Sequence, residues 1–389
     1  MPEYLAPGVY VEEVSSGNKP IAGVPTSTAG FVGCAEKGPL TPQFVSSWAE
    51  FRRIYGTHVP DQSFLAYAVE GFFTNGGQRC FVCRVIGNDS AALTAADFIG
   101  QAEQNTGCSD KPSPATGLIA LEAIDEISIL CVPDEVHPQV KNGAQITTAV
   151  IAQCEKLMDR FGIVSAPANQ KDVTALMPPV DTKYGAFYYP WLKVRDSSID
   201  APRLVPPSGH VAGIYARTDR ERGVHKAPAN EVMQGALDLE FPVTKAMQDL
   251  LNPRGVNCIR DFRGDGRGIR LWGARTMSSD PEWRYINVRR LFLFVEESID
   301  EGTQWVVFEP NNDGTWASVR RNLTNFLSGV WRSGALMGAS QEEAFFVACD
   351  RTTMTQDDID NGRLVCVVGI APVKPAEFVI FRISQKTAS

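Results

Sequence analysis

The middle of the chain alternates short apolar runs with amphipathic stretches, and no other feature constrains the fold more. The runs at 126–134, 162–167 and 184–194 have the length of buried strands, whereas 142–161 and 207–223 have the apolar spacing of helices. Strands that alternate with helices are typical of a mostly parallel sheet with helices on its faces. The sequence therefore predicts an α/β domain.

The same pattern begins further upstream. An apolar strand within 26–39 precedes predicted helices at 46–56 and 63–77, and another strand follows at 79–87. Residues 88–126 are polar and rich in small side chains. Because such composition is typical of surface connections, we interpret this segment as an insertion or a loop.

The final third of the chain has a different composition. Its spacing predicts a long helix at 279–302, apolar nearly all round at 291–295, and an amphipathic helix at 312–336. Three further strands are predicted at 303–310, 343–350 and 363–373. Helices and strands that follow one another in this way favour a separate α+β domain.

Both ends of the chain carry strand signals that have no obvious partner. A strand over 375–384 would be apolar on both faces, because alternate side chains of a strand point in opposite directions. One face would carry Phe378 and Ile380, and the other Val379, Phe381 and Ile383. A second short strand signal, at Val9, Tyr10 and Val11, precedes a linker-like stretch up to residue 20. An unpaired apolar strand is an aggregation hazard, so these segments need neighbours.

Charge and composition argue against several classes of protein. The net charge of −8 is unsuited to coating nucleic acid, and no apolar run reaches the ~18–20 residues of a membrane span. The start of the sequence lacks the basic and apolar regions of a secretory signal. Nine cysteines, an odd number spread over the chain, fit a reducing cytosol better than a disulfide framework. We expect neither a nucleic-acid partner nor membrane insertion.

No motif indicates a metal or a cofactor. Cys80 and Cys83 form a CxxC on a predicted strand, where positions three apart face opposite sides and cannot easily share an ion or a disulfide. The four histidines have no metal-like spacing. The Gly-rich stretch 263–270 lacks the spacing of a phosphate loop, so we interpret it as a turn between two strands.

One motif raises the possibility of a hydrolase. The string GHVAGI, which contains His210, resembles the histidine motif of subtilisin-like serine proteases, and Asp134 ends a strand upstream in the order that those enzymes use. The nucleophile motif fails, because GARTMSSDP places Arg275 and Thr276 where Thr and Ser would be needed. We therefore expect no catalytic residue, and we interpret His210 as a helix-start residue.

Arginine is concentrated in one part of this acidic chain. Residues 254–290 contain nine Arg, no Lys and four acids. The predicted helix at 312–336 adds a polar face made of Arg321, Asn325 and Arg332, with Arg320 flanking its apolar stripe. Such a face is either solvated or docked on an acidic protein surface, since Arg suits fixed, desolvated pairing better than Lys does.

Long stretches of the chain resemble the sheath proteins of contractile tails, as found in contractile phages, R-type pyocins and extracellular contractile injection systems. The resemblance is carried by YLAPGVYVEEV, FVGCAEKGP, FFTNGGQRCFVCRV, PPSGHVAGIYARTDRERGVHKAPAN, LNPRGVNCIRDFRGDGRGIRLWGARTM, YINVRRLFLFVEESI and FLSGVWRSGALMGAS. These strings cover nearly the whole length. The middle domain of that family resembles subtilisin in fold without being a protease, which accounts for the defective GHVAGI match.

The resemblance implies a structural role without an enzyme activity or a cofactor. Sheath subunits stack as hexameric rings around an inner tube protein, with baseplate and terminator or cap proteins at the ends. Terminal arms add strands to the sheets of neighbouring subunits. The sheath assembles in an extended, metastable state and contracts by re-packing rigid domains. Assembly in the bacterial cytoplasm, within a particle that is later released or membrane-anchored, is implied as well.

The resemblance also implies an assignment of segments. We expect an N-terminal arm at 1–20, an outer subtilisin-like α/β domain at 21–270, an inner α+β domain at 271–373 and a C-terminal arm at 374–389. The strand residues of both termini would be the inter-subunit arms, and Arg320, Arg321, Asn325 and Arg332 would face the tube. The alternatives are a serine-type hydrolase on a subtilisin-like scaffold and a generic α/β binding module with swapped termini.

Overall fold

The computed structural model divides the chain into two units, which we describe separately. It describes residues 20–59, 61–86, 93–103, 113–196, 200–380 and 382. The large unit comprises Gly23–Glu297 together with the segment from Pro372 onward, and the small unit comprises Ser298–Ala371 together with the segment up to Ala22.

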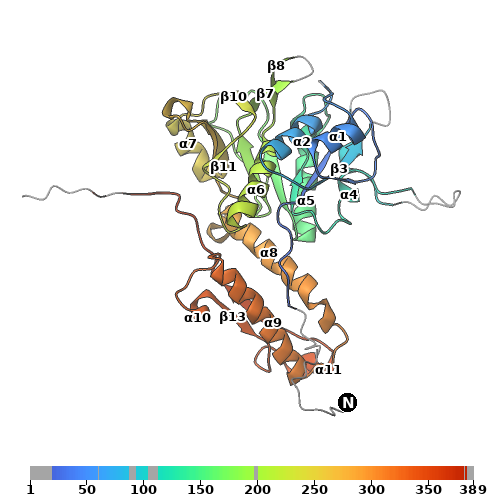
Figure 1. Ribbon diagram of the computed structural model, residues 1–389, viewed down its shortest axis with the longest axis vertical. Helices are drawn as coiled ribbons and strands as arrows, with labels where there is room; N and C mark the ends of the chain where they lie inside the picture. The colour runs from blue at the N-terminus through green and yellow to red at the C-terminus, as the bar shows by residue number, and fades with distance from the viewer. Residues whose placement is uncertain are drawn as a thin grey trace, which may run out of the picture. The chain divides into compact units, whose positions relative to one another are not determined.

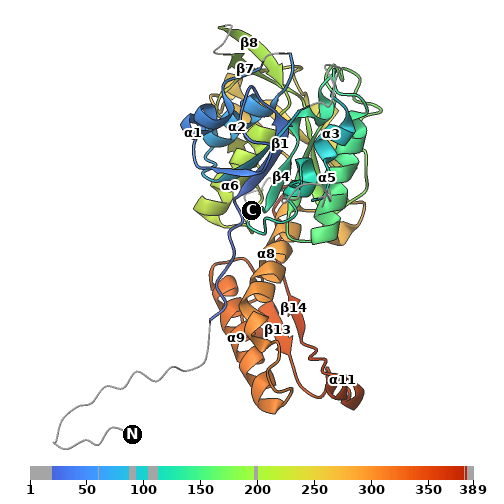
Figure 2. The ribbon, with the colours of Figure 1, turned by 90° about the vertical axis from the view of Figure 1, so that its right-hand side faces the viewer.

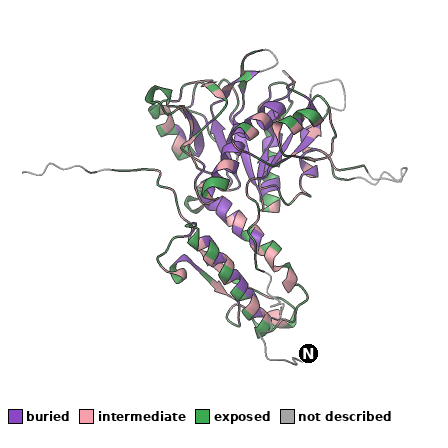
Figure 3. Cartoon of the chain, viewed as in Figure 1, coloured by how far each residue is buried: buried purple, intermediate pink, exposed green. Residues whose placement is uncertain are grey.

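A nine-stranded sheet, in the order β2-β3-β1-β4-β5-β6-β11-β12-β9, forms the centre of the large unit. Its strands are β1 (Ala29–Cys34), β2 (Gln43–Val45), β3 (Cys80–Val85), β4 (Ile129–Cys131), β5 (Phe161–Ser165), β6 (Gly185–Tyr189), β9 (Glu231–Val232), β11 (Val256–Asp261) and β12 (Ile269–Trp272). The six strands from β3 to β11 are parallel. β1, β4, β5 and β6 are buried almost throughout, as expected of parallel strands covered on both faces (Figure 3).

Helices cover both faces of this sheet (Figure 2). On one face lie α1 (Trp48–Tyr55), α2 (Leu65–Thr74) and α6 (Ser208–Arg222), and on the other α3 (Ala95–Ile99), α4 (Gly117–Ala120) and α5 (Gly143–Leu157). α2 and α6 pack backbone to backbone, because a Cβ added at Gly209 would lie 2.3 Å from the Cα of Ala68 and one at Gly213 would lie 2.4 Å from the carbonyl oxygen of Phe72. The glycines of GHVAGI are therefore needed for helix packing.

Smaller elements complete the large unit. A three-stranded sheet, in the order β10-β7-β8, is made of β7 (Leu192–Asp196), β8 (Ala201–Val205) and β10 (Ala236–Leu239). The remaining elements are α7 (Lys245–Leu251) and the short 3-10 helices η1 (Pro133–Val136), η2 (Asn252–Arg254), η3 (Arg263–Asp265) and η4 (Pro281–Trp283). Helix α8 (Ile286–Thr303) begins in the large unit, and its last residues belong to the small unit.

The small unit is built around the long helix α9 (Asp313–Arg332), which packs against β13 (Phe345–Ala348) (Figure 1). β13 pairs with β14 (Val367–Ile370) in an antiparallel two-stranded sheet. The other elements are η5 (Gln304–Val306), α10 (Gln341–Ala344) and α11 (Gln356–Asp360). The buried core consists of Ile21, Trp316, Val319, Leu323, Cys349 and Met354. Asn312 caps α9, since its side-chain oxygen accepts hydrogen bonds from the backbone of Gly314 and Thr315.

The predicted α/β architecture with a large, mainly parallel sheet is confirmed. The strand predicted at 303–310 is wrong, because these residues form the end of α8, η5 and a turn. Trp305 and Val306 pack against the core of the small unit, and this packing prevails over their β-branched and aromatic composition. The run at 184–194 divides into β6 and β7, separated by Pro190 and Trp191.

The two units divide the chain differently from the predicted domains. Residues 271–297 belong to the large unit, although the sequence placed them in the C-terminal domain. Residues from Pro372 onward also return to the large unit after β14. Among the described residues, no helix is long and apolar enough to cross a membrane.

Candidate assembly sites

In a doubly wound sheet the usual catalytic crevice lies where the direction of the crossovers reverses, at the carboxyl ends of the strands. Here that position falls between β1 and β4. Asp134, which follows β4, is fully buried, and its carboxylate accepts hydrogen bonds from the Ser63 hydroxyl (2.7 Å) and from the backbone N–H groups of Phe64 and Cys34. Burial raises the pKa of Asp134 to about 6, in spite of these bonds. The buried carboxylate therefore holds together the connections that follow β1 and β4 and the start of α2.

The structure does not assemble the triad that the sequence suggested. His210 is 3% exposed, its ring packs against Gly71, and burial lowers its pKa to about 4. None of the described hydrogen bonds of Asp134 involves His210. The hydroxyl of Thr276 donates to the carbonyl oxygen of Trp283. The side chains of Asp134, His210 and Thr276 thus each make contacts within the fold and do not contact one another as a triad would.

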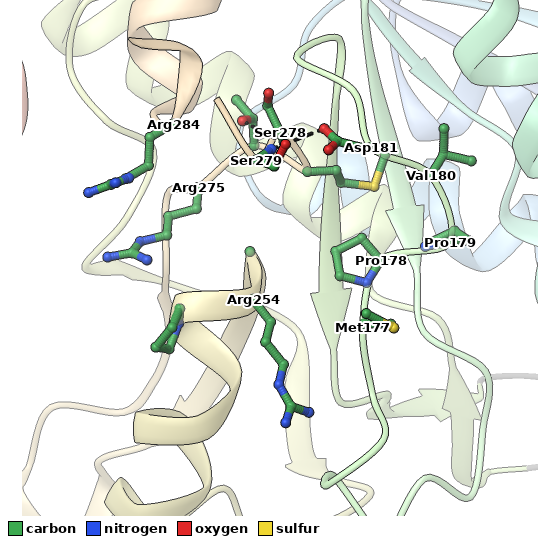
Figure 4. A pocket seen from close by; sticks show the side chains of 14 residues that line it. Met177, Pro178, Pro179, Val180, Asp181, Arg254, Arg275, Ser278, Ser279 and Arg284 are labelled. Atoms are coloured by element: carbon green, nitrogen blue, oxygen red, sulfur yellow. Dashed lines mark hydrogen bonds between the residues drawn. The ribbon is translucent and has the colours of Figure 1, made fainter. Parts of the chain in front are cut away.

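One pocket of the large unit has about 460 Å³ and an arginine-rich wall (Figure 4). Arg254, Arg275 and Arg284 lie on one side, opposite the stretch from Met177 to Asp181. The guanidinium of Arg254 donates to the carbonyl oxygen of Thr174 at 2.6 Å. Arg275 binds the carboxylate of Glu377 in the C-terminal segment, so this one residue of the wall takes part in the attachment of that segment.

The C-terminal segment changes abruptly from bound to exposed. Glu377 accepts two hydrogen bonds from Arg275, at 2.9 and 2.6 Å, and one from Asn252 at 2.7 Å. The next three residues are largely exposed: Phe378 72%, Val379 69% and Ile380 78%. They form no strand within the chain. Phe381 and Ile383 lie outside the described residues, as do Val9, Tyr10 and Val11 at the other terminus.

The described part of the small unit contains a sheet of only two strands. β13 and β14 pair from Phe345 with Ile370 to Ala348 with Val367, and each has an outer edge without a partner strand. Phe346 is 57% and Val367 43% exposed. A two-stranded sheet is marginally stable alone, and its open edges can pair with further strands.

The predicted polar face of α9 is exposed. Arg320, Arg321, Asn325 and Arg332 are all exposed, whereas the apolar stripe of the helix is buried. Arg320 lies 3.8 Å from Asp350 in a half-exposed ion pair. Asn325 also lines a pocket of about 330 Å³ beside Pro20, at the root of the N-terminal segment. Arg321, Asn325 and Arg332 share one exposed face of α9, Arg320 lies at the edge of the buried stripe, and contact of these residues with a tube stays a prediction.

Sequence reasoning missed the residues that hold the C-terminal segment. Glu377 was treated as part of a strand, and Arg275 only as a replacement for a nucleophile motif. The one signal was an acidic residue next to an apolar terminal run, with many arginines elsewhere. Its partners lie more than 90 residues away in the sequence, so the pairing itself was not visible.

Comparison with known proteins identifies the family of the chain. A family profile described as "Phage tail sheath protein central domain" matches residues 90–277, and another, "Phage tail sheath C-terminal domain", matches residues 278–386. A putative prophage major tail sheath protein of Pseudomonas aeruginosa is 29% identical over 245 residues, which cover 61% of each chain. The chain therefore matches less than two thirds of the length of that relative.

Solved structures match nearly the whole chain. The helical sheath of the anti-feeding prophage in its contracted state has a TM-score of 0.79 and 33% identity, and the match covers 98% of this chain and 99% of that one. The sheath complex of an extracellular contractile injection system, PVC, also in a contracted state, has a TM-score of 0.77 and 30% identity, with 99% of both chains covered. These matches are to structural sheath proteins of contractile, phage tail-like particles and not to enzymes. The chain belongs to the phage tail sheath family.

Proposed function

We propose that this contractile sheath subunit polymerises as stacked hexameric rings around an inner tube and contracts to drive that tube through a target envelope. The proposal rests on two features that occur together in the described part of the chain. An apolar terminal segment is exposed at Phe378, Val379 and Ile380, and a two-stranded sheet has free edges. An exposed apolar segment and an open sheet edge each promote aggregation of a monomer. In a polymer, the segment of one subunit can add as a strand to the sheet of another.

The acceptor in this proposal is the β13–β14 sheet of a neighbouring subunit. The nine-stranded sheet also has edges, but its edge strands, β2 and β9, have three and two residues and offer few main-chain groups. β13 and β14 have four residues each and, in the part of the chain that the structure describes, form a sheet of only two strands, whereas β8 and β10 are the edges of a three-stranded sheet. An added strand would use their free N–H and C=O groups and cover Phe346 and Val367.

The energetic scale supports strand exchange as a binding mode. Full burial of Phe378, Val379 and Ile380 would stabilise the contact by about 1.5–3 kcal/mol for each side chain. Ordering the backbone opposes this by about 1–2 kcal/mol for each residue. One arm therefore binds weakly, and a stable sheath requires many arms acting together.

The exposed face of α9 is the proposed tube contact. Arg321, Asn325 and Arg332 lie on the face of α9 opposite the core of the small unit, and Arg320 adds a third cation at the edge of the buried stripe. A tube surface with acidic side chains would complement them, since the planar guanidinium binds carboxylates in two-pronged pairs.

The remaining assignments rest on the resemblance to sheath proteins. We retain the outer role for the α/β region at 21–270, the inner role for the region at 271–373 and the arm roles for 1–20 and 374–389. The order of the parallel strands and the GHVAGI helix packing support a subtilisin-like origin of the large unit without its chemistry. The partners would be identical subunits, the inner tube, and baseplate and cap proteins, in a particle assembled in the bacterial cytoplasm.

The experiment is electron microscopy of the purified full chain, alone and with the C-terminal segment 375–389 deleted. The full chain is expected to form tubular polymers with sixfold symmetry. The truncated chain is expected to stay folded by circular dichroism and to remain unpolymerised. A full chain that stays monomeric at high concentration, in both the presence and the absence of tube protein, would contradict the proposal.

A further inference from the structure

The root of the C-terminal arm is held by a built carboxylate site on the large unit. Glu377 receives two charge-assisted hydrogen bonds from Arg275, one from the Asn252 amide and a longer one from the Tyr285 hydroxyl (3.3 Å). Burial alone would raise the pKa of Glu377, but the bonds from Arg275 and Asn252 lower it overall. The carboxylate is therefore ionised at neutral pH.

Residues of the large unit other than Glu377 also hold Arg275 in place. Arg275 is only 9% exposed, and its guanidinium also donates to the carbonyl oxygen of Asn252 at 3.0 Å. The Asn257 side chain bonds both the N–H and the C=O of Arg275, each at 2.7 Å. Both the backbone and the guanidinium of Arg275 are thus held in place. The N–H donors of the planar guanidinium match the two oxygens of a carboxylate.

A second contact holds the segment four residues earlier. Asn287, at the start of α8, donates from its side-chain amide to the carbonyl oxygen of Val373 at 3.0 Å. Between Val373 and Glu377 the chain is attached at both ends to the large unit. From Phe378 onward the described residues are exposed, and the last coloured part of the chain runs away from the body of that unit (Figure 1).

We propose that Glu377 and Arg275 form an anchor that fixes where the C-terminal arm leaves its own subunit, so that only residues from Phe378 onward are offered to a neighbour. This inference rests on the proposed sheath function and assigns positioning roles to residues of the large unit. The anchor has two consequences. It sets the strand register, because a slip of one residue would turn every side chain of the arm to the opposite face. It also transmits a force that acts on the arm directly to the large unit, without passing through β14.

The test compares Glu377→Ala with a matched control in the full-length chain. Glu296→Ala is the control, because it breaks another 2.6 Å ion pair of the large unit, with Arg289, far from the arm in sequence. Polymer yield is measured by sedimentation over a range of concentrations, and the melting temperature of the monomer by circular dichroism. The anchor predicts that Glu377→Ala raises the concentration needed for polymerisation by about tenfold or more, because the unanchored arm must be ordered when it binds. Its melting temperature should match that of Glu296→Ala, whose polymer yield should be normal.

Two further measurements separate positioning from a general loss of stability. In the Glu377→Ala monomer, hydrogen exchange of the peptide 372–380 should become faster while the rest of the large unit is unchanged. Exchanging the charges, with Arg275→Glu and Glu377→Arg together, should restore polymerisation at least in part. The inference is overturned if Glu377→Ala polymerises at the wild-type concentration, or if the exchange of 372–380 is unaltered. A wild-type chain that fails to polymerise would instead refute the proposed function itself.

Discussion

Glu135 offers a quantitative test of how the large unit uses buried carboxylates. This side chain follows β4 and is 5% exposed, and burial raises its pKa from 4.5 to about 7. Its two oxygens accept hydrogen bonds from the backbone N–H of Ser165 and the hydroxyl of Thr147, each at 2.8 Å. In an enzyme such a perturbed acid would suggest catalysis. Here both oxygens bind structural partners, so we predict an effect on stability alone.

The sign of the effect follows from proton binding. Between pH 4.5 and about 7 the folded state holds the Glu135 proton more often than the unfolded state does, so the free energy of unfolding falls as the pH rises. One pKa unit corresponds to about 1.4 kcal/mol, and the full loss is therefore about 3 kcal/mol above pH 7. The amide of Glu135→Gln has nearly the same shape and cannot ionise. Its stability relative to wild type should increase by roughly 2–3 kcal/mol between pH 5 and pH 8.5.

The assay is urea unfolding at these two pH values, with hydrogen exchange of α5 assigning the transition to the large unit. Asp134 titrates in the same direction, since its pKa is raised to about 6. It is present in both proteins, so its contribution cancels in the comparison. A stability difference between wild type and Glu135→Gln that is independent of pH would refute the reasoning.

Two further predictions concern helix packing and the tube-facing surface. Gly209→Ala should destabilise the large unit by about 1–3 kcal/mol, because its Cβ would meet backbone atoms of α2. On α9, a Cβ added at Gly329 would meet no other part of the described chain within 4 Å. Gly329→Ala should therefore stabilise the small unit by about 0.5–1 kcal/mol. Thermal melts of both variants check these two predictions. Arg320→Glu combined with Arg321→Glu should leave the monomer folded, since both residues are exposed, but should stop sheaths from forming on tubes. Co-sedimentation of this double variant with tubes at normal yield would show that another surface contacts the tube.

The sequence predicted those parts of the fold that depend on local periodicity. The alternation of apolar runs and amphipathic segments gave the parallel sheet and its helices, because buried strands and amphipathic helices each impose their own period. The stripe of α9 was equally clear, and its polar face lies exposed where expected. The secondary-structure prediction fails where tertiary packing determines whether a segment is a helix or a strand. Trp305 and Val306 have the composition of a strand but extend a helix end, because they fill the core of the small unit.

The anchor of the C-terminal arm was beyond prediction for a related reason. Glu377 meets Arg275, Asn252 and Tyr285 only after β11, β12 and α8 have folded side by side. No local pattern connects an acid at the end of the chain with residues about 100 positions earlier. Conversely, the local pattern of the GHVAGI string suggested a catalytic histidine that the structure does not support. The structure gives its glycines and His210 a packing role.

The central claim, that subunits are joined by terminal strands, is tested most directly by the structure of the assembled polymer at a resolution that shows main-chain hydrogen bonds. The account predicts that Phe378–Ile380 of one subunit form a strand paired with β13 or β14 of another, with Glu377 still bound to Arg275 of its own subunit. A polymer in which these residues remain unpaired, or fold back onto their own subunit, would contradict it.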